Sequence, residues 1–123
     1  MAMSFYNQFT HSSDADSAGT EVEAEGETLQ ARRDRKGGIF VIDAMAVEGI
    51  DVRNNEQTQV TPEMLDKYDK IINMAGEGHT PDWLSNHPNY IAWDVEDPGG
   101  KGLVETNKAK EVIRLKVLEL IGQ

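Results

Sequence analysis

Two short apolar runs with a helix start between them constrain the fold of this chain most strongly. Residues 70–75 (KIINMA) and residues 90–93 (YIAW) have the length and the β-branched or aromatic composition of strands. The pair Thr80 and Pro81 predicts a helix between them, and the spacing of apolar residues predicts a longer helix over residues 102–120. Because strands that alternate with helices usually pair in parallel, the pattern predicts an α/β domain with an open parallel sheet.

Three further helices are predicted before the first of these strands. Residues 1–11 and residues 39–47 each carry apolar side chains on one helical face, and Gly49 ends the second helix. Thr61 and Pro62 mark the start of a third, short helix. The side chains that we expect to face inward are Phe40, Ala44 and Val47 in the second helix and Val112, Ile113, Val117, Leu120 and Ile121 in the C-terminal helix.

The segment between the first and second helices is predicted to hold an edge strand and a loop. Residues 16–20 (DSAGT) are small, and we expect them to pair at the edge of the sheet before a tight turn. Residues 21–38 are predicted to form a mobile, exposed loop, since an acidic run is followed by four basic residues within residues 32–36. We interpret the basic run as a solvated charge cluster, and a patch that binds an anionic ligand is the alternative.

Length and charge narrow the class of protein. The 123 residues suffice for one domain, so residues 1–123 are expected to fold as a single unit. Acidic residues outnumber basic residues by 22 to 12, and the net charge of -10 argues against nucleic acid or an anionic membrane as a partner. The apolar runs are far shorter than the ~20 residues of a membrane-spanning helix. The N-terminus also lacks the regions of a signal peptide, so the expected location is the cytoplasm.

One loop offers a candidate acid. Asp97 and Pro98 follow the last predicted strand, and ligands of open α/β sheets bind beyond the carboxyl ends of the strands. An aspartic acid at this position can protonate a leaving-group oxygen, while Pro98 restricts the backbone beside it. An ordinary Asp-Pro turn is the alternative.

Several other kinds of site are excluded. The sequence contains no cysteine, so residues 1–123 hold no disulfide, no zinc-thiolate site and no thiol nucleophile. His79 and His87 lack the spacing of a metal site, and no glycine-rich phosphate loop is present. We therefore expect neither a metal nor a cofactor.

Four segments, in the same order along the chain, resemble the low-molecular-weight protein tyrosine phosphatase and arsenate reductase-like family. They are residues 16–20, 43–51, 69–74 and 93–98. The resemblance implies a three-layer fold in which an open, four-stranded parallel sheet is flanked by helices. It also implies a hydrolase that cleaves phosphate monoesters through a cysteinyl-phosphate.

The same resemblance implies roles for individual residues. The family's general acid corresponds to Asp97, and Pro98 follows it in the acid loop. Ser17 and Gly19 correspond to a segment that supports the phosphate-binding loop. The implied substrate is a phosphorylated protein or a small aryl phosphate.

The chain departs from the family at its start. The family opens with a strand and a Cys-x5-Arg-Ser loop, whose cysteine attacks phosphorus while the arginine and backbone N–H groups hold the phosphate. Met1 corresponds to the beginning of the family's first helix. We therefore expect an N-terminally truncated phosphatase-like domain that lacks the first, central strand and is inactive alone.

A missing central strand leaves several outcomes open. The sheet would rearrange, bind a partner in the gap, or be marginally stable, because unpaired buried backbone groups cost roughly 1–3 kcal/mol each. The alternatives to an enzyme are a non-catalytic binding protein that keeps the fold and a homo-oligomer formed by strand exchange.

Overall fold

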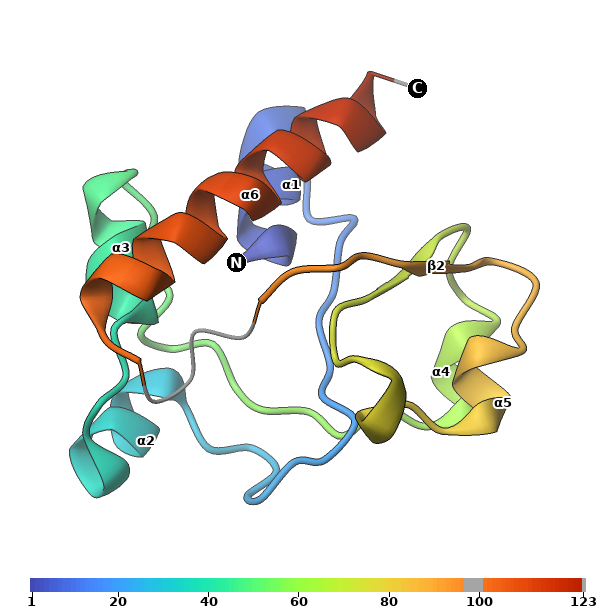
Figure 1. Cartoon of the computed structure of the whole chain (residues 1–123), viewed down its shortest axis with the longest axis horizontal. Coiled ribbons are helices and arrows are strands. Elements are labelled where there is room, and N and C mark those ends of the chain that lie inside the picture. Colours follow the sequence, from blue (N-terminus) through green and yellow to red (C-terminus); the bar gives the residue numbers. More distant parts are fainter. Residues whose placement is uncertain (97–100, 123) are drawn as a thin grey trace.

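The computed structural model describes residues 1–96 and 101–122 and shows a mixed α/β fold (Figure 1). Over these residues the chain forms six α-helices, one 3-10 turn and a sheet of two parallel strands. The α-helices are α1 (Ala2–Thr10), α2 (Leu29–Lys36), α3 (Val41–Val47), α4 (Pro62–Leu65), α5 (Asp82–Ser85) and α6 (Leu103–Ile121). The strands are β1 (Ile71–Asn73) and β2 (Tyr90–Ala92), and the 3-10 turn η1 covers Glu77–His79.

The two strands lie where the sequence predicts them and pair in parallel. Ile71 lies opposite Tyr90, and the register continues to Asn73 opposite Ala92. The α5 crossover follows β1 and leads back to β2, as parallel pairing requires. The expectation of a mixed α/β fold with a parallel sheet is therefore confirmed at this coarse level.

The sheet is smaller than the sequence analysis predicts. Residues 16–20 form no strand, and their contribution is one isolated parallel bridge between Gly19 and Gln59. Among the described residues, β1 and β2 pair only with each other, so each strand has one edge without a neighbour. A strand needs consecutive bridges, and residues 16–20 contribute only this single one.

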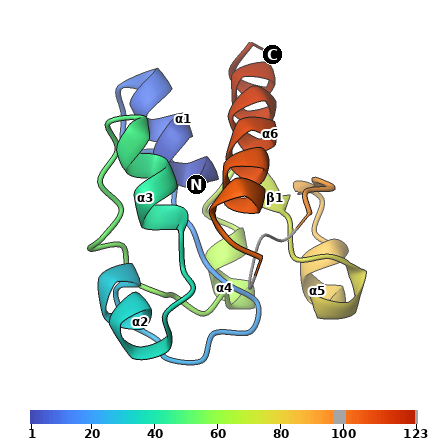
Figure 2. The same ribbon diagram turned by 60° about the vertical axis from the view of Figure 1, so that its left-hand side comes forward.

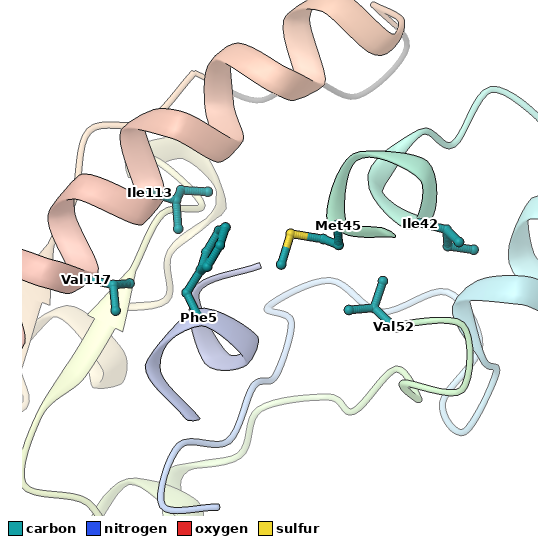
Figure 3. Close-up of a cluster of buried hydrophobic side chains, with 6 residues drawn as sticks. All are labelled: Phe5, Ile42, Met45, Val52, Ile113 and Val117. Carbon is teal, nitrogen blue, oxygen red and sulfur yellow. The ribbon is translucent and has the colours of Figure 1, made fainter. Parts of the chain in front are cut away.

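The hydrophobic core lies between α6 and the two helices that pack against it. Figure 2 shows α1 and α3 beside α6, and both helices contact α6. Figure 3 shows the central cluster, to which α1, α3, the segment after α3 and α6 all contribute. Its members are Phe5, Ile42, Met45, Val52, Ile113 and Val117. At the other end of the molecule, α4 and α5 lie together beside the sheet (Figure 1).

The buried face of α3 differs from the predicted face. Ala44 is buried as expected, but Val47 is 79% exposed, and Ile42 and Met45 are buried instead. The helix begins only at Val41, and contact with α6 selects the face that carries Ala44 and Met45. Val47 is the last residue of the helix and projects away from the core.

The buried face of α6 is also only partly the predicted one. Ile113 and Val117 are buried, but Val112 and Ile121 are exposed. The other buried positions are small or polar, namely Thr106, Ala109 and Lys110. The helix carries apolar residues on two faces, and the spacing of these residues does not reveal which face packs against α1 and α3.

A helix, α2, occupies part of the segment for which the sequence analysis predicts a loop. Thr28 caps its start, since its hydroxyl accepts a hydrogen bond from the backbone N–H of Ala31 at 3.1 Å. Gly37 ends it with a φ of 69°, in the left-handed region that glycine adopts without strain. The sequence therefore carries a helix-start signal, Thr28, before the basic run and a helix-stop signal, Gly37, after it.

The basic side chains of α2 pair with nearby acidic residues. Arg35 binds both carboxylate oxygens of Glu27 at 2.8 and 2.9 Å, and Lys36 lies 3.0 Å from Glu23. Arg33 contacts Asp43 at 3.3 Å. The Arg35 guanidinium lowers the pKa of the Glu27 carboxyl. These contacts partner three of the four basic side chains within or beside their own segment, which favours the solvated charge cluster over a patch for an anion.

A bidentate pair after α3 gives a testable pH response. Arg53 donates to Asp51 through its guanidinium at 2.8 and 3.0 Å and through its backbone N–H at 3.0 Å. These bonds lower the pKa of Asp51 from its ordinary 3.8 to about 2. Because the pKa is depressed in the folded state, the stabilising contribution is present above 3.8 and is lost as the pH falls towards 2.

We expect an NMR titration of the Asp51 carboxyl carbon to give a pKa of about 2 in the folded chain. In Arg53→Ala the guanidinium donors are lost and only the backbone bond remains, so the pKa should rise towards 3.8. The urea-unfolded chain is the control and should titrate near 3.8 with or without Arg53. A native pKa that does not respond to Arg53→Ala would contradict the assignment.

No helix in the described part of the chain is both long enough and apolar enough to cross a membrane.

Candidate functional site

The structure places two of the four predicted site residues. Ser17 and Gly19 lie in the extended segment that follows α1, where Ser17 is exposed and Gly19 is half-buried. Asp97 and Pro98 lie outside the described residues. Residues 93–96, which precede them in the sequence, follow β2 at the carboxyl end of the parallel pair.

The extended segment is anchored to α1 at its beginning. The Asn7 side-chain amide forms two hydrogen bonds with the backbone of Ala15. Its Nδ2 donates to the Ala15 carbonyl at 3.1 Å, and its Oδ1 accepts from the Ala15 N–H at 2.9 Å. His11 has a φ of 53°, so the chain turns sharply at the end of α1. The direction of residues 16–20 is therefore set by contacts with α1.

Gly19 occupies a position where a larger residue does not fit. Its N–H donates to Thr58 O at 2.8 Å, and its carbonyl accepts from Val60 N at 2.9 Å. A Cβ at this position would lie 2.8 Å from Cγ2 of Val22. The close approach of Val22 therefore favours glycine at this position.

The side chain of Gln59 fixes the turn after Gly19. Its Oε1 accepts a hydrogen bond from Val22 N at 2.9 Å, and its Nε2 donates to the Thr20 carbonyl at 2.8 Å. The sequence analysis did not identify Gln59, because it lies 37 and 39 residues away from these partners along the chain.

The segment of residues 16–21 is linked through side chains to both ends of the β1 region. The Tyr68 hydroxyl, three residues before β1, donates to Oδ2 of Asp16, and this bond raises the pKa of Tyr68. His79, at the end of η1 after β1, lies 3.0 Å from Glu21 through its Nδ1. Since Asp16 meets the chain before β1 and Glu21 meets the chain after it, the segment runs in the same direction as β1.

No backbone bridge joins residues 16–21 to β1, although both segments are described throughout. Side chains connect the two segments instead, through Asp16 with Tyr68 and Glu21 with His79.

The edge of β1 that does not face β2 carries free backbone groups. Ile71 and Asn73 bond to the β2 side, through Ile71 N to Asn89 O at 3.0 Å and Trp93 N to Asn73 O at 2.8 Å. In a strand, alternate residues bond to opposite edges, so Ile72 directs its N–H and C=O to the other edge. No strand in the described part of the chain pairs with that edge.

A polar network links Asn73, at the carboxyl end of β1, to Tyr90 at the start of β2 and to Thr80. Asn73 donates through its side-chain amide to the hydroxyl oxygens of Thr80 at 2.7 Å and Tyr90 at 3.0 Å. Its Oδ1 accepts from Ala75 N at 3.1 Å. Beyond β2, Trp93 lies under the Lys116 ammonium, 5.8 Å from the ring centre. The start of the loop that leads to Asp97 is therefore fixed against both β1 and α6.

A small hollow lies beside this loop. Its volume is about 100 Å³, and it is bounded by Val95 and Glu96 on one side and by α6 on the other. Lys101 and Glu96, which both line the hollow, form an ion pair that lowers the pKa of the Glu96 carboxyl. Within residues 1–96 and 101–122, no group of three or more histidine or carboxylate side chains could hold a metal ion.

Comparison with protein-family models gave no match, and comparison with curated proteins gave none either. The resemblance to the phosphatase family therefore rests on the four sequence segments, of which residues 97–98 lie outside the described part of the chain.

Proposed function

We propose that residues 1–123 provide the scaffold and the acid loop of a low-molecular-weight phosphatase-like hydrolase. The observation that carries this proposal is the free edge of β1: no strand in the described part of the chain pairs with it, although side chains of residues 16–21 contact the chain before and after β1. In the family that the sequence resembles, a central strand pairs with the corresponding edge and leads into the Cys-x5-Arg loop. Because residues 1–123 contain no cysteine, we expect them to have no cysteine-dependent phosphatase activity of their own.

The proposed reaction divides between this chain and the added strand and loop. The cysteine of the loop attacks phosphorus, and its arginine and backbone N–H groups hold the phosphate oxygens. Asp97 protonates the leaving-group oxygen, and water then hydrolyses the cysteinyl-phosphate. Pro98 restricts the backbone at the acid, while Ser17 and Gly19 support the loop. The substrate is a phosphorylated protein or a small aryl phosphate.

Two features of the described residues support this arrangement. Residues 93–96, which lead towards Asp97 in the sequence, follow β2 at the carboxyl end of the parallel pair, where open α/β sheets place their ligands. The N-terminus of α1 lies against the core cluster through Met1 and Ala2, so a loop ahead of Met1 would lead directly into this helix. Helix N-termini favour bound phosphate through their free N–H groups.

The test is to fuse a β-strand and a Cys-x5-Arg loop ahead of Met1 and to assay hydrolysis of p-nitrophenyl phosphate. We expect turnover from the fused chain and none from residues 1–123 alone. Replacing the added cysteine with serine should abolish turnover. Asp97→Asn in the fused chain should lower kcat by about 10²- to 10⁴-fold, the range for a lost general acid.

The free edge of β1 favours one alternative, a non-catalytic protein that binds an extended partner or exchanges strands with a second copy. A fused chain that is folded by circular dichroism and NMR but shows no cysteine-dependent turnover would contradict the enzyme proposal. Perturbation of the Ile72 amide resonance by a strand peptide without the loop would then support the alternative.

A further inference from the structure

A histidine between α5 and β2 has a partner at each of its ring nitrogens. His87 is largely buried, with 13% of its side chain exposed. Its Nε2 lies 3.2 Å from Oδ1 of Asp66, the residue that follows α4. On the other side of the ring, Nδ1 accepts a hydrogen bond from the backbone N–H of Asn89 at 3.1 Å. The ring therefore connects the end of α4 to the segment that leads into β2.

These two contacts select one form of the ring. A ring nitrogen that accepts a hydrogen bond carries no proton, so the single proton of the neutral imidazole lies on Nε2. From there it is donated to the carboxylate of Asp66. Pro88 stands between His87 and Asn89, and its fixed backbone angle restricts the shape of this turn. The arrangement is therefore that of a neutral His87.

Asn89 also connects the two strands at their amino ends. Its carbonyl accepts from Ile71 N at 3.0 Å, which is a backbone bond at the start of the parallel pair. Its side-chain Nδ2 donates to the Tyr68 carbonyl at 3.0 Å, so the chain before β1 is held as well. A change at the Asn89 N–H therefore reaches the point where β1 and β2 begin to pair.

Asp66 is the charged group that faces the ring. Among the described residues, no other acidic or basic side chain forms an ion pair or a hydrogen bond with His87. Because the Asp66 side chain is 86% exposed, its attraction for a protonated ring is screened by water and contributes little. The hydroxyls of Tyr68 and Tyr90 bond to other partners. The remaining charged side chains on the adjoining segments belong to exposed residues, namely Glu63, Lys67, Asp69, Lys70 and Asp82.

We propose that His87 is a proton-sensitive latch at the amino ends of β1 and β2. The neutral ring binds the Asn89 N–H and so keeps the Asn89 carbonyl in place against Ile71. A proton added at Nδ1 removes the lone pair that this N–H uses and sets two N–H groups against each other. Asn89 is then released, and the pairing of the two strands loosens where it begins. Because histidine ordinarily gains its proton between about pH 8 and pH 5, acidification over this range opens the latch.

NMR of the imidazole nitrogens between about pH 8 and pH 5 tests the latch in the native chain. At the upper end we expect the His87 ring to carry its proton on Nε2. As the ring gains its second proton, the Asn89 amide resonance should move with the same midpoint. Hydrogen-exchange protection of the Ile71 amide should fall by about three- to tenfold, the equivalent of one hydrogen bond. His79, which pairs with Glu21, is the internal control, and its titration should not set the Asn89 midpoint.

Two substitutions place a side-chain amide at different ring positions. In His87→Asn, Oδ1 takes the place of Nδ1 and accepts from Asn89 at every pH, so the pH response of the Asn89 amide should vanish. In His87→Gln the amide reaches the position of Nε2 instead, and Ile71 should be less protected already at about pH 8. Asp66→Asn should keep the response, because the bond between His87 and Asn89 remains.

Three results would overturn the proposal. They are a neutral His87 ring with its proton on Nδ1, an Asn89 amide that does not change as His87 titrates, and a folded His87→Asn variant that keeps the full pH response. The first two come from the native chain, so they do not depend on whether the variants fold. The latch is independent of the proposed hydrolase, because it involves residues 66–90 alone and is measured without an added loop.

Discussion

Replacing Phe5 with alanine is expected to lower the free energy of unfolding by about 3–5 kcal/mol, the usual cost of removing a buried aromatic ring. Phe5 is 1% exposed and contacts α3 and α6 residues in the core cluster (Figure 3). It also stacks on Phe9 with a ring-centre distance of 5.6 Å. Because domains of this kind are stable by only ~5–15 kcal/mol in total, the loss is a large fraction of the stability.

Urea denaturation followed by tryptophan fluorescence measures this loss, since Trp93 packs against the same cluster. Val47→Ala is the control, because Val47 is exposed and its truncation should change stability by no more than about 0.5 kcal/mol. A Phe5→Ala variant that unfolds at nearly the same urea concentration as the original chain would show that α1 does not dock on α6 as described.

The second large effect is expected at Lys110, a buried charge between α6 and α3. Its Nζ donates to the Ala44 carbonyl at 3.1 Å and lies 3.7 Å from Oε1 of Glu48. The Lys110 side chain is only 9% exposed, while that of Glu48 is 31% exposed. Lys110→Ala removes the packed stem and both polar contacts, and it should cost about 3 kcal/mol.

Lys110→Met separates packing from charge. Methionine keeps a stem of similar length without the ammonium group, and Glu48 is exposed enough to be hydrated when it loses its partner. We therefore expect Lys110→Met to lose less than about 1 kcal/mol, since an apolar replacement of a buried ion pair is often close to neutral. The same denaturation measurement applies. Equal losses for the two variants would mean that the ammonium contacts, and not the stem, stabilise this interface.

Short-range signals in the sequence predicted the elements that depend on neighbouring residues. Thr61 and Pro62 mark the start of α4, and the runs that contain β1 and β2 are compact and apolar. The face that a helix buries depends instead on what packs against it. For α6, with apolar residues on two sides, the contact with α1 decides that Val117 is buried and Leu115 is exposed.

Long-range contacts explain the remaining differences. The segment that contains α2 was predicted to be a loop because its consecutive charged residues are typical of solvent-exposed chain. In the structure, Arg35 pairs with Glu27, eight residues away. The contact between Tyr68 and Asp16 spans 52 residues, and no local pattern predicts it. Of the candidate site, the position of Gly19 beside Val22 is explained by close packing, while the role of Asp97 stays a prediction.

The free edge of β1 also bears on how this chain behaves in concentrated solution. An unpaired edge next to Ile71 and Ile72 can template the addition of strands from other molecules, which is a route to aggregates. Natural sheets often guard such edges with charge, and here the protection comes from the whole chain, whose net charge of -10 keeps copies apart. Acidification that neutralises the carboxylates, or high salt that screens them, removes this colloidal protection while leaving the edge in place.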